Sequence, residues 1–271
     1  MSVRAAVACS TLFALFTLIH GKPLSEPTPA TWPNDWKAHV VGAGSSFALN
    51  GTFGPEGSHG TYYYDFNNNR ARGDYVYNGT KPNKSGSQIW LGKEGKYLVY
   101  AAPHLGKLAF CIEIHIKDPV TQAAVGILLP DWMAKSNHTY VGRETLSFVD
   151  DLTNETQTVS TEHFKAFWGD DGEKTFDMWS DSKTGAPVRI LGKDPRPSKY
   201  VVEEGQFTYN HFEVNATTDA DFKPYWTWDC IPVNEKATSR TMAGARFGSP
   251  AFAHRAMQLL EQVRESSETT K

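Results

Sequence analysis

The side chains that could carry out chemistry in this sequence are histidines, acids and cysteines, and none of them forms a known catalytic motif. The nucleophile motif G-x-S-x-G, the metalloprotease motif H-E-x-x-H, the P-loop and a complete G-x-G-x-x-G are absent from the chain. His115 follows Glu113 by two residues, so the pair could share a proton or a cation, although a solvated polar face is the simpler interpretation. Because a catalytic triad assembles in space, a hydrolase stays the less favoured alternative to a protein that is not an enzyme.

Acidic residues gather at three places and could offer the oxygen ligands that calcium prefers. These places are Asp150-Asp151, Asp170-Asp171 with Glu173, and Asp219 with Asp221. None of them matches the twelve-residue EF-hand loop. Ordinary solvated loops are the default interpretation and a surface calcium ion is the alternative, so we assign no metal ligand and expect no other cofactor.

The cysteines predict one disulfide. Cys9 lies in an N-terminal apolar stretch, which leaves Cys111 and Cys230, and two cysteines in an oxidising compartment most simply pair. The bridge would close a long loop, and the chain-entropy model gives such a bridge about 4–5 kcal/mol. Two free buried thiols or a catalytic cysteine are the alternatives.

The N-terminal residues 1–21 are typical of a secretory signal. Arg4 precedes an apolar run of about fifteen residues, and Gly21 supplies a small residue near its end. A membrane anchor is the rival interpretation, but crossing a bilayer core takes about twenty apolar residues. No later stretch is long enough to span a membrane. We therefore expect a protein of the secretory pathway, in the extracellular space or the endolysosomal lumen.

N-glycosylation sequons support this location. Six Asn-x-Ser/Thr sites occur where chance would give about two in a chain of this composition. Their asparagines are Asn50, Asn78, Asn83, Asn137, Asn154 and Asn215. A sequon must lie on an exposed segment to be modified, so these positions also mark expected loops and strand ends.

Composition excludes some classes of partner and favours a β-sheet. The chain has 271 residues, 40% of them hydrophobic and 13% aromatic, with a net charge of −3. The missing basic excess argues against nucleic acid and against an anionic membrane surface. The aromatic content, with 22 glycines and 15 prolines, favours strands and turns over long helices.

Alternating apolar residues predict the strands of this sheet. Tyr62, Tyr64 and Phe66 share one face of a strand over residues 61–66, and an Asn67–Asn69 turn leads to a return strand over 70–77. The clearest alternation covers residues 108–117, with Leu108, Phe110, Ile112, Ile114 and Ile116 on one face. Cys111 lies on the polar face of this strand, so its disulfide would lie on the outside of the sheet.

The remaining pattern predicts one mainly β domain. Further strands are expected over 145–149, 159–168, 174–180, 186–191 and 205–214, in a strongly curved antiparallel meander. Residues 130–134 are weakly helical, and a C-terminal helix is expected over 249–265, with Ser249 as its N-cap. The predicted division is a signal peptide (1–21), a flexible leader (22–35), the curved β domain (36–248), the helix and a tail (266–271).

The aromatic surplus has two interpretations. It can fill a core, or it can line a pocket for an apolar ligand, because such pockets are largely aromatic and aliphatic. A curved sheet with one short helix has no second sheet over its concave face, which favours a pocket there. The candidate lining residues are Tyr64, Phe110, Ile112, Ile114, Phe164, Trp168 and Phe176.

Several segments in a shared order resemble the ependymin-related proteins and the related N-terminal domains of secreted protist proteins. These segments are the Tyr-rich hairpin over 60–72, residues 140–144, 164–168, 179–189, and Phe222-Lys223-Pro224 leading to Cys230. The resemblance implies a half-barrel like that of bacterial lipoprotein carriers (the LolA-like superfamily), with a hydrophobic pocket. It also implies a secreted or lysosomal glycoprotein, often dimeric, that binds lipid and sometimes calcium and is not known as an enzyme. The small number of cysteines and the helical extension after Cys230 depart from that family.

Two functions of different classes follow. The first is a secreted glycoprotein that binds a lipid or another apolar small molecule in a concave-sheet pocket, as a monomer or a homodimer. The second is an extracellular adhesion or regulatory module without a small-molecule ligand. Arg72-Gly73-Asp74 spells an adhesion tripeptide, but the predicted position on a return strand is not the exposed loop tip that recognition would need.

Overall fold

A computed structural model of the chain describes residues 26–43, 58–77, 84–101, 110–116, 127–168, 174–193, 204–227 and 229–233. The predicted signal peptide, the C-terminal helix and the tail lie outside these ranges, as do Asn50, Asn78 and Asn83. No helix of the described residues is long and apolar enough to cross a membrane.

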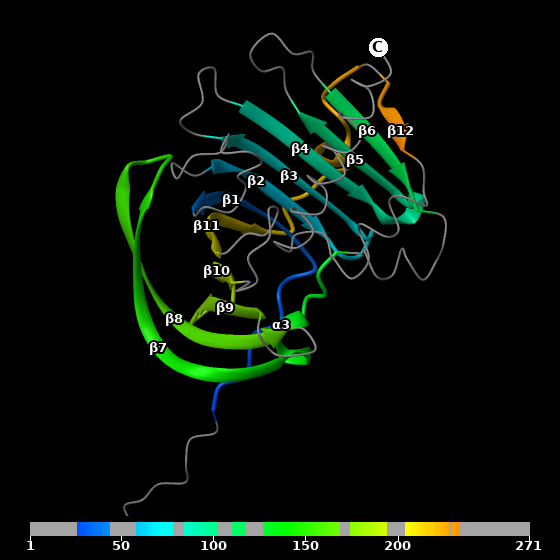
Figure 1. Cartoon of the computed structure of the whole chain (residues 1–271). Helices are drawn as coiled ribbons and strands as arrows, with labels where there is room; N and C mark the ends of the chain where they lie inside the picture. Colours follow the sequence, from blue (N-terminus) through cyan, green and yellow to red (C-terminus); the bar gives the residue numbers. More distant parts are fainter. Residues whose placement is uncertain are drawn as a thin grey trace, which may run out of the picture.

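The described residues form one large sheet of twelve strands (Figure 1). The strands are β1 (Asp35–Ala43), β2 (Ser58–Asp65), β3 (Arg70–Tyr77), β4 (Lys84–Leu91), β5 (Lys96–Ala101), β6 (Phe110–His115), β7 (Asn137–Asp150), β8 (Glu155–Trp168), β9 (Lys174–Asp181), β10 (Pro187–Lys193), β11 (Glu204–Val214) and β12 (Ile231–Val233). Their order across the sheet is β12-β6-β5-β4-β3-β2-β1-β11-β10-β9-β8-β7. The predicted mainly β, curved antiparallel architecture is confirmed.

Two antiparallel meanders build this sheet. Strands β1 to β6 form one run and β7 to β11 form the other, and the antiparallel pairing of β1 with β11 joins them. The short strand β12 adds to β6 in parallel, which places the region of Cys230 beside Cys111. The Asn67–Asn69 turn lies where the sequence predicted it, and Asn69 takes the left-handed backbone conformation with φ 51°.

The main core lies on one face of the sheet, which we call the inner face. Alternate residues of the strands point there, as Trp36 and Ala38 do from β1 and Tyr62 and Tyr64 from β2. The short helix α3 (Trp132–Lys135) lies over this face and buries Trp132 and Met133 in the core. The weak helical signal at residues 130–134 thus corresponds to a single turn.

Only part of the β7–β8 hairpin pairs with the rest of the sheet. Strand β8 pairs with β9 only from Thr161 to Trp168. The part of β8 that precedes Thr161 and the residues 145–150 of β7 that pair with it extend past the sheet, and we call this part of the hairpin the arm. Figure 1 shows this hairpin bending around the lower and left side of the molecule. Leu146 from this arm packs with Trp179 and Val188 in a second apolar cluster. Because Trp179 alternates with the inner residue Met178, the arm covers the opposite, outer face.

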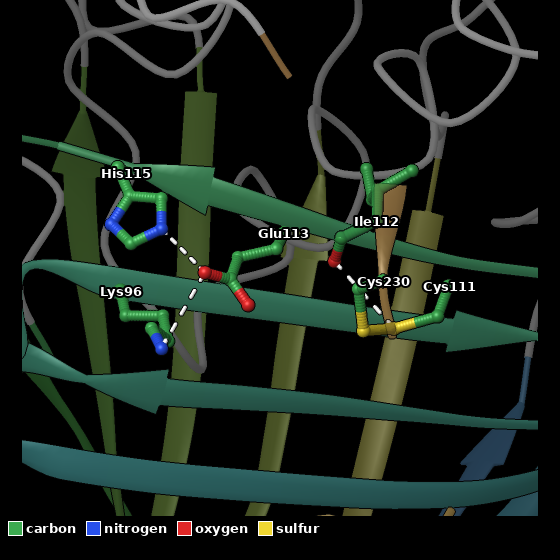
Figure 2. Close-up of a disulfide and its surroundings, with 6 residues drawn as sticks. All are labelled: Lys96, Cys111, Ile112, Glu113, His115 and Cys230. Carbon is green, nitrogen blue, oxygen red and sulfur yellow. Dashed lines mark hydrogen bonds and ion pairs between the residues drawn. A yellow bond between two sulfur atoms is a disulfide. The ribbon is translucent and has the colours of Figure 1, made fainter. Parts of the chain in front are cut away.

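The outer face near the other edge carries the disulfide. Cys111 and Cys230 are bonded, with their Cα atoms 4.6 Å apart, and the pairing predicted from the sequence is present (Figure 2). Cys111 packs with Ile89, Leu98 and the ring of Trp226 in a third cluster. The bridge therefore lies on the side of the sheet opposite the main core, as the alternation around Cys111 predicted.

Candidate ligand-binding face

The structure brings the predicted pocket residues together on the inner face. Tyr64, Ile112, Ile114 and Phe164 are fully buried there, and Phe176 is partly buried against them. Phe110 and Trp168 have backbones in β6 and β8, but their side chains fall outside the described part of the chain. The described candidates thus belong to one apolar cluster, although they come from opposite ends of the sheet.

Trp36 lies at the centre of this cluster and was not among the predicted pocket residues. Its ring stacks on Tyr64 at 5.2 Å and on Phe212 at 4.9 Å, and it meets Tyr209 edge-on at 6.0 Å. These separations are typical of favourable aromatic pairs. Because β1 of the first meander pairs with β11 of the second, Trp36 contacts aromatic residues of both meanders.

Two short segments lie over this aromatic centre, and we call them the cover. One carries Trp32, which is buried although it lies in the segment expected to be a flexible leader, and the other is residues 127–133. The two segments are linked to each other, since the Trp32 N–H donates to the Pro130 carbonyl at 2.9 Å. The hydroxyl of Tyr64 donates to the Leu128 carbonyl at 2.6 Å and ties the cover to the sheet.

The rings of the cover pack edge to face. Trp32 meets Trp36 at 5.7 Å, Trp132 at 6.0 Å and Tyr64 at 6.5 Å, with interplanar angles of 82°, 81° and 78°. Sequence reasoning missed Trp32 and Trp132. The available signal was a tryptophan within a polar, proline-bearing segment, because a ring of that size is costly to leave in water.

Three buried indole N–H groups of this cluster have no acceptor among the residues that the structure describes. They belong to Trp32, Trp36 and Trp132. A buried donor without a partner costs about 1–3 kcal/mol, and native proteins contain few of them. The centre of the inner face therefore consists of apolar side chains but also contains hydrogen-bond donors that no described residue satisfies.

Burial also keeps the inner tyrosines uncharged. Desolvation raises the pKa of Tyr62 and of Tyr209 well above the ordinary value. Desolvation raises the pKa of Tyr64 as well, and the nearby carboxylate of Asp131 adds to that effect. These hydroxyls remain neutral at any physiological pH, so the inner face offers a ligand no tyrosinate.

Several polar groups of the outer face are paired with one another. Figure 2 shows Glu113 between His115 and Lys96, and the Lys96 Nζ lies 3.4 Å from the Glu113 Oε1. Nearly half of the His115 side chain is exposed, which fits a solvated polar face. On β8, His163 stacks on Trp179 and contacts the carboxylates of Glu144 and Asp177, each at 2.8 Å.

The tip of the β7–β8 hairpin is joined to the outer face by two histidine–aspartate pairs. His39 Nε2 lies 2.8 Å from Asp151 Oδ1, and His211 Nε2 lies 2.8 Å from Asp150 Oδ2. His211 adopts φ 49°, a left-handed conformation that is uncommon for residues other than glycine but that histidine tolerates better than most. His39 and Asp151 are 112 positions apart, and no local sequence pattern announces their contact.

The acidic clusters that the structure describes have protein partners. Asp219 accepts from Arg70 at 2.7 Å, and Asp221 closes a capping box with Thr218 at the start of the 3₁₀ helix Asp219–Phe222. Among the residues that the structure describes, no group of three or more His, Cys, Asp or Glu side chains could hold a metal ion. Asp170, Asp171 and Glu173 lie outside the described residues.

The Arg72-Gly73-Asp74 tripeptide lies in the middle of β3 rather than at a loop tip. Arg72 is buried, its Nε donates to Asp74 at 2.9 Å, and its Nη1 donates to the carbonyls of Asp221 and Lys223. The guanidinium thus holds the 219–223 segment on the outer face. It is not displayed for recognition by another protein.

The described sequons lie on the surface. Asn137, Asn154 and Asn215 are all exposed, at the start of β7, in the β7–β8 turn and just after β11. Asn154 and Asn215 have φ of 58° and 53°, the left-handed region that asparagine tolerates better than most residues. These positions meet the exposure that glycosylation requires.

The described residues thus define the class of architecture, an open, curved and predominantly antiparallel sheet with one aromatic face. No family model and no curated protein sequence matches the chain. Among solved structures, it is similar to an uncharacterized conserved protein from Thermus thermophilus, with 13% identity and a TM-score of 0.41 over 74% of this chain and 90% of that one. It is also similar to MucB (12%, TM-score 0.37, over 75% of this chain and 62% of MucB) and to a LolA superfamily protein from Nitrosomonas europaea (8%, TM-score 0.29, over 72% and 93%).

Proposed function

We propose that this protein is not an enzyme but a carrier or sensor that binds an apolar ligand on the inner face of its sheet. The observation that carries the proposal is the buried cluster of aromatic and aliphatic side chains around Trp36, to which both meanders contribute. A sheet with one apolar face needs a second layer to bury it. Within the described residues that layer is the cover, namely Trp32 and residues 127–133.

Entry of a ligand between the sheet and the cover is the mechanism that we propose. The Tyr64 hydroxyl ties the cover to the sheet, and the cover's rings meet those of the sheet edge to face. A hydrocarbon chain lying between the cover and the sheet could take the place of these ring contacts at little cost, because apolar contact is not directional and scales with the buried area. The uncharged tyrosines and the aliphatic residues Ile112 and Ile114 would then line the ligand.

A matched pair of phenylalanine variants tests this proposal. Phe176 is partly buried against the inner-face cluster, and Phe148 is partly buried against the outer cluster under the hairpin. Affinity for a fluorescent fatty acyl probe is measured for Phe176→Ala and Phe148→Ala. The inner variant should weaken the probe several-fold and the outer variant should not, whereas equal effects or no uptake by the unaltered protein would contradict the proposal.

We also propose that the protein acts as a secreted glycoprotein, in the extracellular space or the endolysosomal lumen. The Cys111–Cys230 bridge and the three exposed sequons support this location. Calcium is not needed for the proposed binding. Enzymatic removal of N-glycans from protein secreted by a eukaryotic host should lower its mass, and an unchanged mass would contradict the glycoprotein assignment.

An interaction module is the second candidate, and the edge strand β7 favours it. This fourteen-residue strand ends the sheet and has β8 as its one neighbour in the order of the described strands. Val141 and Val149 are more than half exposed on it. An edge of this kind can pair with another chain, including a second copy of this one. Mass measurement in solution, with and without Val149→Lys, would show whether dimers form through β7.

A further inference from the structure

The unpartnered indole N–H groups of the inner face indicate what kind of ligand it takes. Trp32, Trp36 and Trp132 are each at least nine-tenths buried, and each lacks an acceptor for its Nε1 among the described residues. Trp32 lies between the other two, with ring centroids 5.7 Å from Trp36 and 6.0 Å from Trp132. A pure hydrocarbon in this place would leave all three donors unsatisfied, so the arrangement favours a ligand that brings oxygen acceptors.

The charge around the tryptophans favours an uncharged acceptor. Indole donates a hydrogen bond without carrying a charge. The charged group that acts on Tyr64, which packs against Trp32 and Trp36, is the carboxylate of Asp131, and that group is negative. A ligand carboxylate buried here would need a paired cation. The Lys135 ammonium pairs with Asp131 and is mostly exposed. A carbonyl oxygen therefore fits these donors better than a free carboxylate.

We propose that the three indoles bind the ester carbonyl oxygens of a neutral acylglycerol, whose acyl chains lie on the apolar inner face. This inference rests on the proposed function and narrows its ligand to one chemical class. A glycerol backbone carries an ester carbonyl on each of two neighbouring carbons, so one ligand brings acceptors for more than one of these donors. The cover carries two of the three donors, so ester binding would also position the cover over the ligand.

The test compares an ester with its ether analogue. Dioctanoylglycerol and the matching dialkylglycerol ether have similar chains and size, but only the ester has carbonyl oxygens. Protein labelled with ¹⁵N at its eight tryptophans is titrated with each compound, and the indole resonances are assigned by single Trp→Phe variants. The ester should bind about tenfold more tightly than the ether, and it should move the resonances of Trp32, Trp36 and Trp132 downfield.

Two Trp→Phe variants compare an inner indole with an outer one. Trp132→Phe removes one inner N–H and should weaken the ester about three- to tenfold, the range expected for one net hydrogen bond, with little effect on the ether. Trp226→Phe changes an indole packed in the outer cluster and should affect neither compound. Equal affinity of ester and ether with unmoved inner resonances would overturn the ester assignment and leave the apolar site standing. Octanoate that binds as tightly as the ester would overturn the inference that the ligand's acceptor is uncharged. Uptake of none of the compounds would overturn the proposed function itself.

Discussion

His211 of β11 reaches the tip of the β7–β8 hairpin, where its Nε2 lies 2.8 Å from Oδ2 of the buried Asp150. The contact ties the far end of a long arm back to the middle of the sheet. Desolvation alone would raise the pKa of Asp150, but hydrogen bonds from the Leu152 N–H and the His211 ring outweigh it and lower that pKa. The outer cluster around Leu146 is enclosed between this contact and the pairing of β8 with β9.

Replacing Asp150 should therefore loosen the arm. Asp150→Asn keeps the shape of the side chain and removes the charge that pairs with His211. We expect amide hydrogen exchange to become several-fold faster in the arm around Leu146 and to stay unchanged in β2 and β3. Asp219→Asn, at an exposed ion pair with Arg70, is the control and should leave the arm unchanged. Unaltered exchange in the Asp150 variant would show that the contact does not hold the arm.

Acid should destabilise the fold through its buried carboxylates. Asp65, like Asp150, loses solvation on folding, but hydrogen bonds from Asn68 and Arg70 outweigh this and lower its pKa. A carboxyl whose folded pKa is depressed stabilises the fold above its unfolded pKa of about 3.9, and this contribution is lost as pH falls through the folded value. The urea midpoint should fall steeply below about pH 4. Asp65→Asn should flatten that fall, and an equally steep fall in the variant would contradict this explanation.

Loss of the disulfide should cost stability but not ligand binding. The bridge joins residues 119 positions apart, and the chain-entropy model gives a loop of that length about 4–5 kcal/mol. The double variant Cys111→Ser, Cys230→Ser should lower the free energy of unfolding by about that amount. Because the bridge lies on the outer face, affinity for a lipid probe should remain within twofold of the unaltered protein. A large loss of affinity in a folded double variant would contradict the placement of the ligand site on the inner face.

Arg72 should act as a structural residue rather than an adhesive one. Lysine at this position cannot reproduce the donors to Asp74, Asp221 and Lys223, so Arg72→Lys should cost about 2–3 kcal/mol. Arg143→Lys, at an exposed pair with Glu162, should change the unfolding free energy by less than about 0.5 kcal/mol. Cell adhesion to the folded protein should not respond to soluble Arg-Gly-Asp peptide, and inhibition by that peptide would contradict the buried placement.

Local alternation predicted the strands whose two faces differ most. Ile112 and Ile114 alternate with Cys111 and Glu113, and both their strand and the outer position of the disulfide followed from that pattern. The Tyr62 and Tyr64 face was found for the same reason. Pattern and turn chemistry therefore predicted the antiparallel sheet and part of the inner face, whereas its half-barrel curvature was an expectation from the family resemblance.

The missed features depend on contacts between distant residues. Strand β7 is exposed along most of its length, so it lacks an apolar alternation, and only residues 145–149 were predicted from it. Trp32 is buried because residues 127–133 pack on it, and although the size of its ring indicated burial, nothing in the local sequence identified that partner segment. The pairing of His39 with Asp151 joins residues 112 positions apart. Such contacts arise from the fold, so they could not be deduced before the sheet order was known.

The central claim is that the inner face holds an apolar ligand, and native mass spectrometry of the protein secreted by a eukaryotic host tests it most directly. Gentle desolvation of the full-length secreted protein should show a one-to-one adduct that organic extraction identifies as a lipid. Phe176→Ala should reduce the occupied fraction, and Phe148→Ala should not. A reproducibly ligand-free protein that also fails to take up added dioctanoylglycerol would contradict the account.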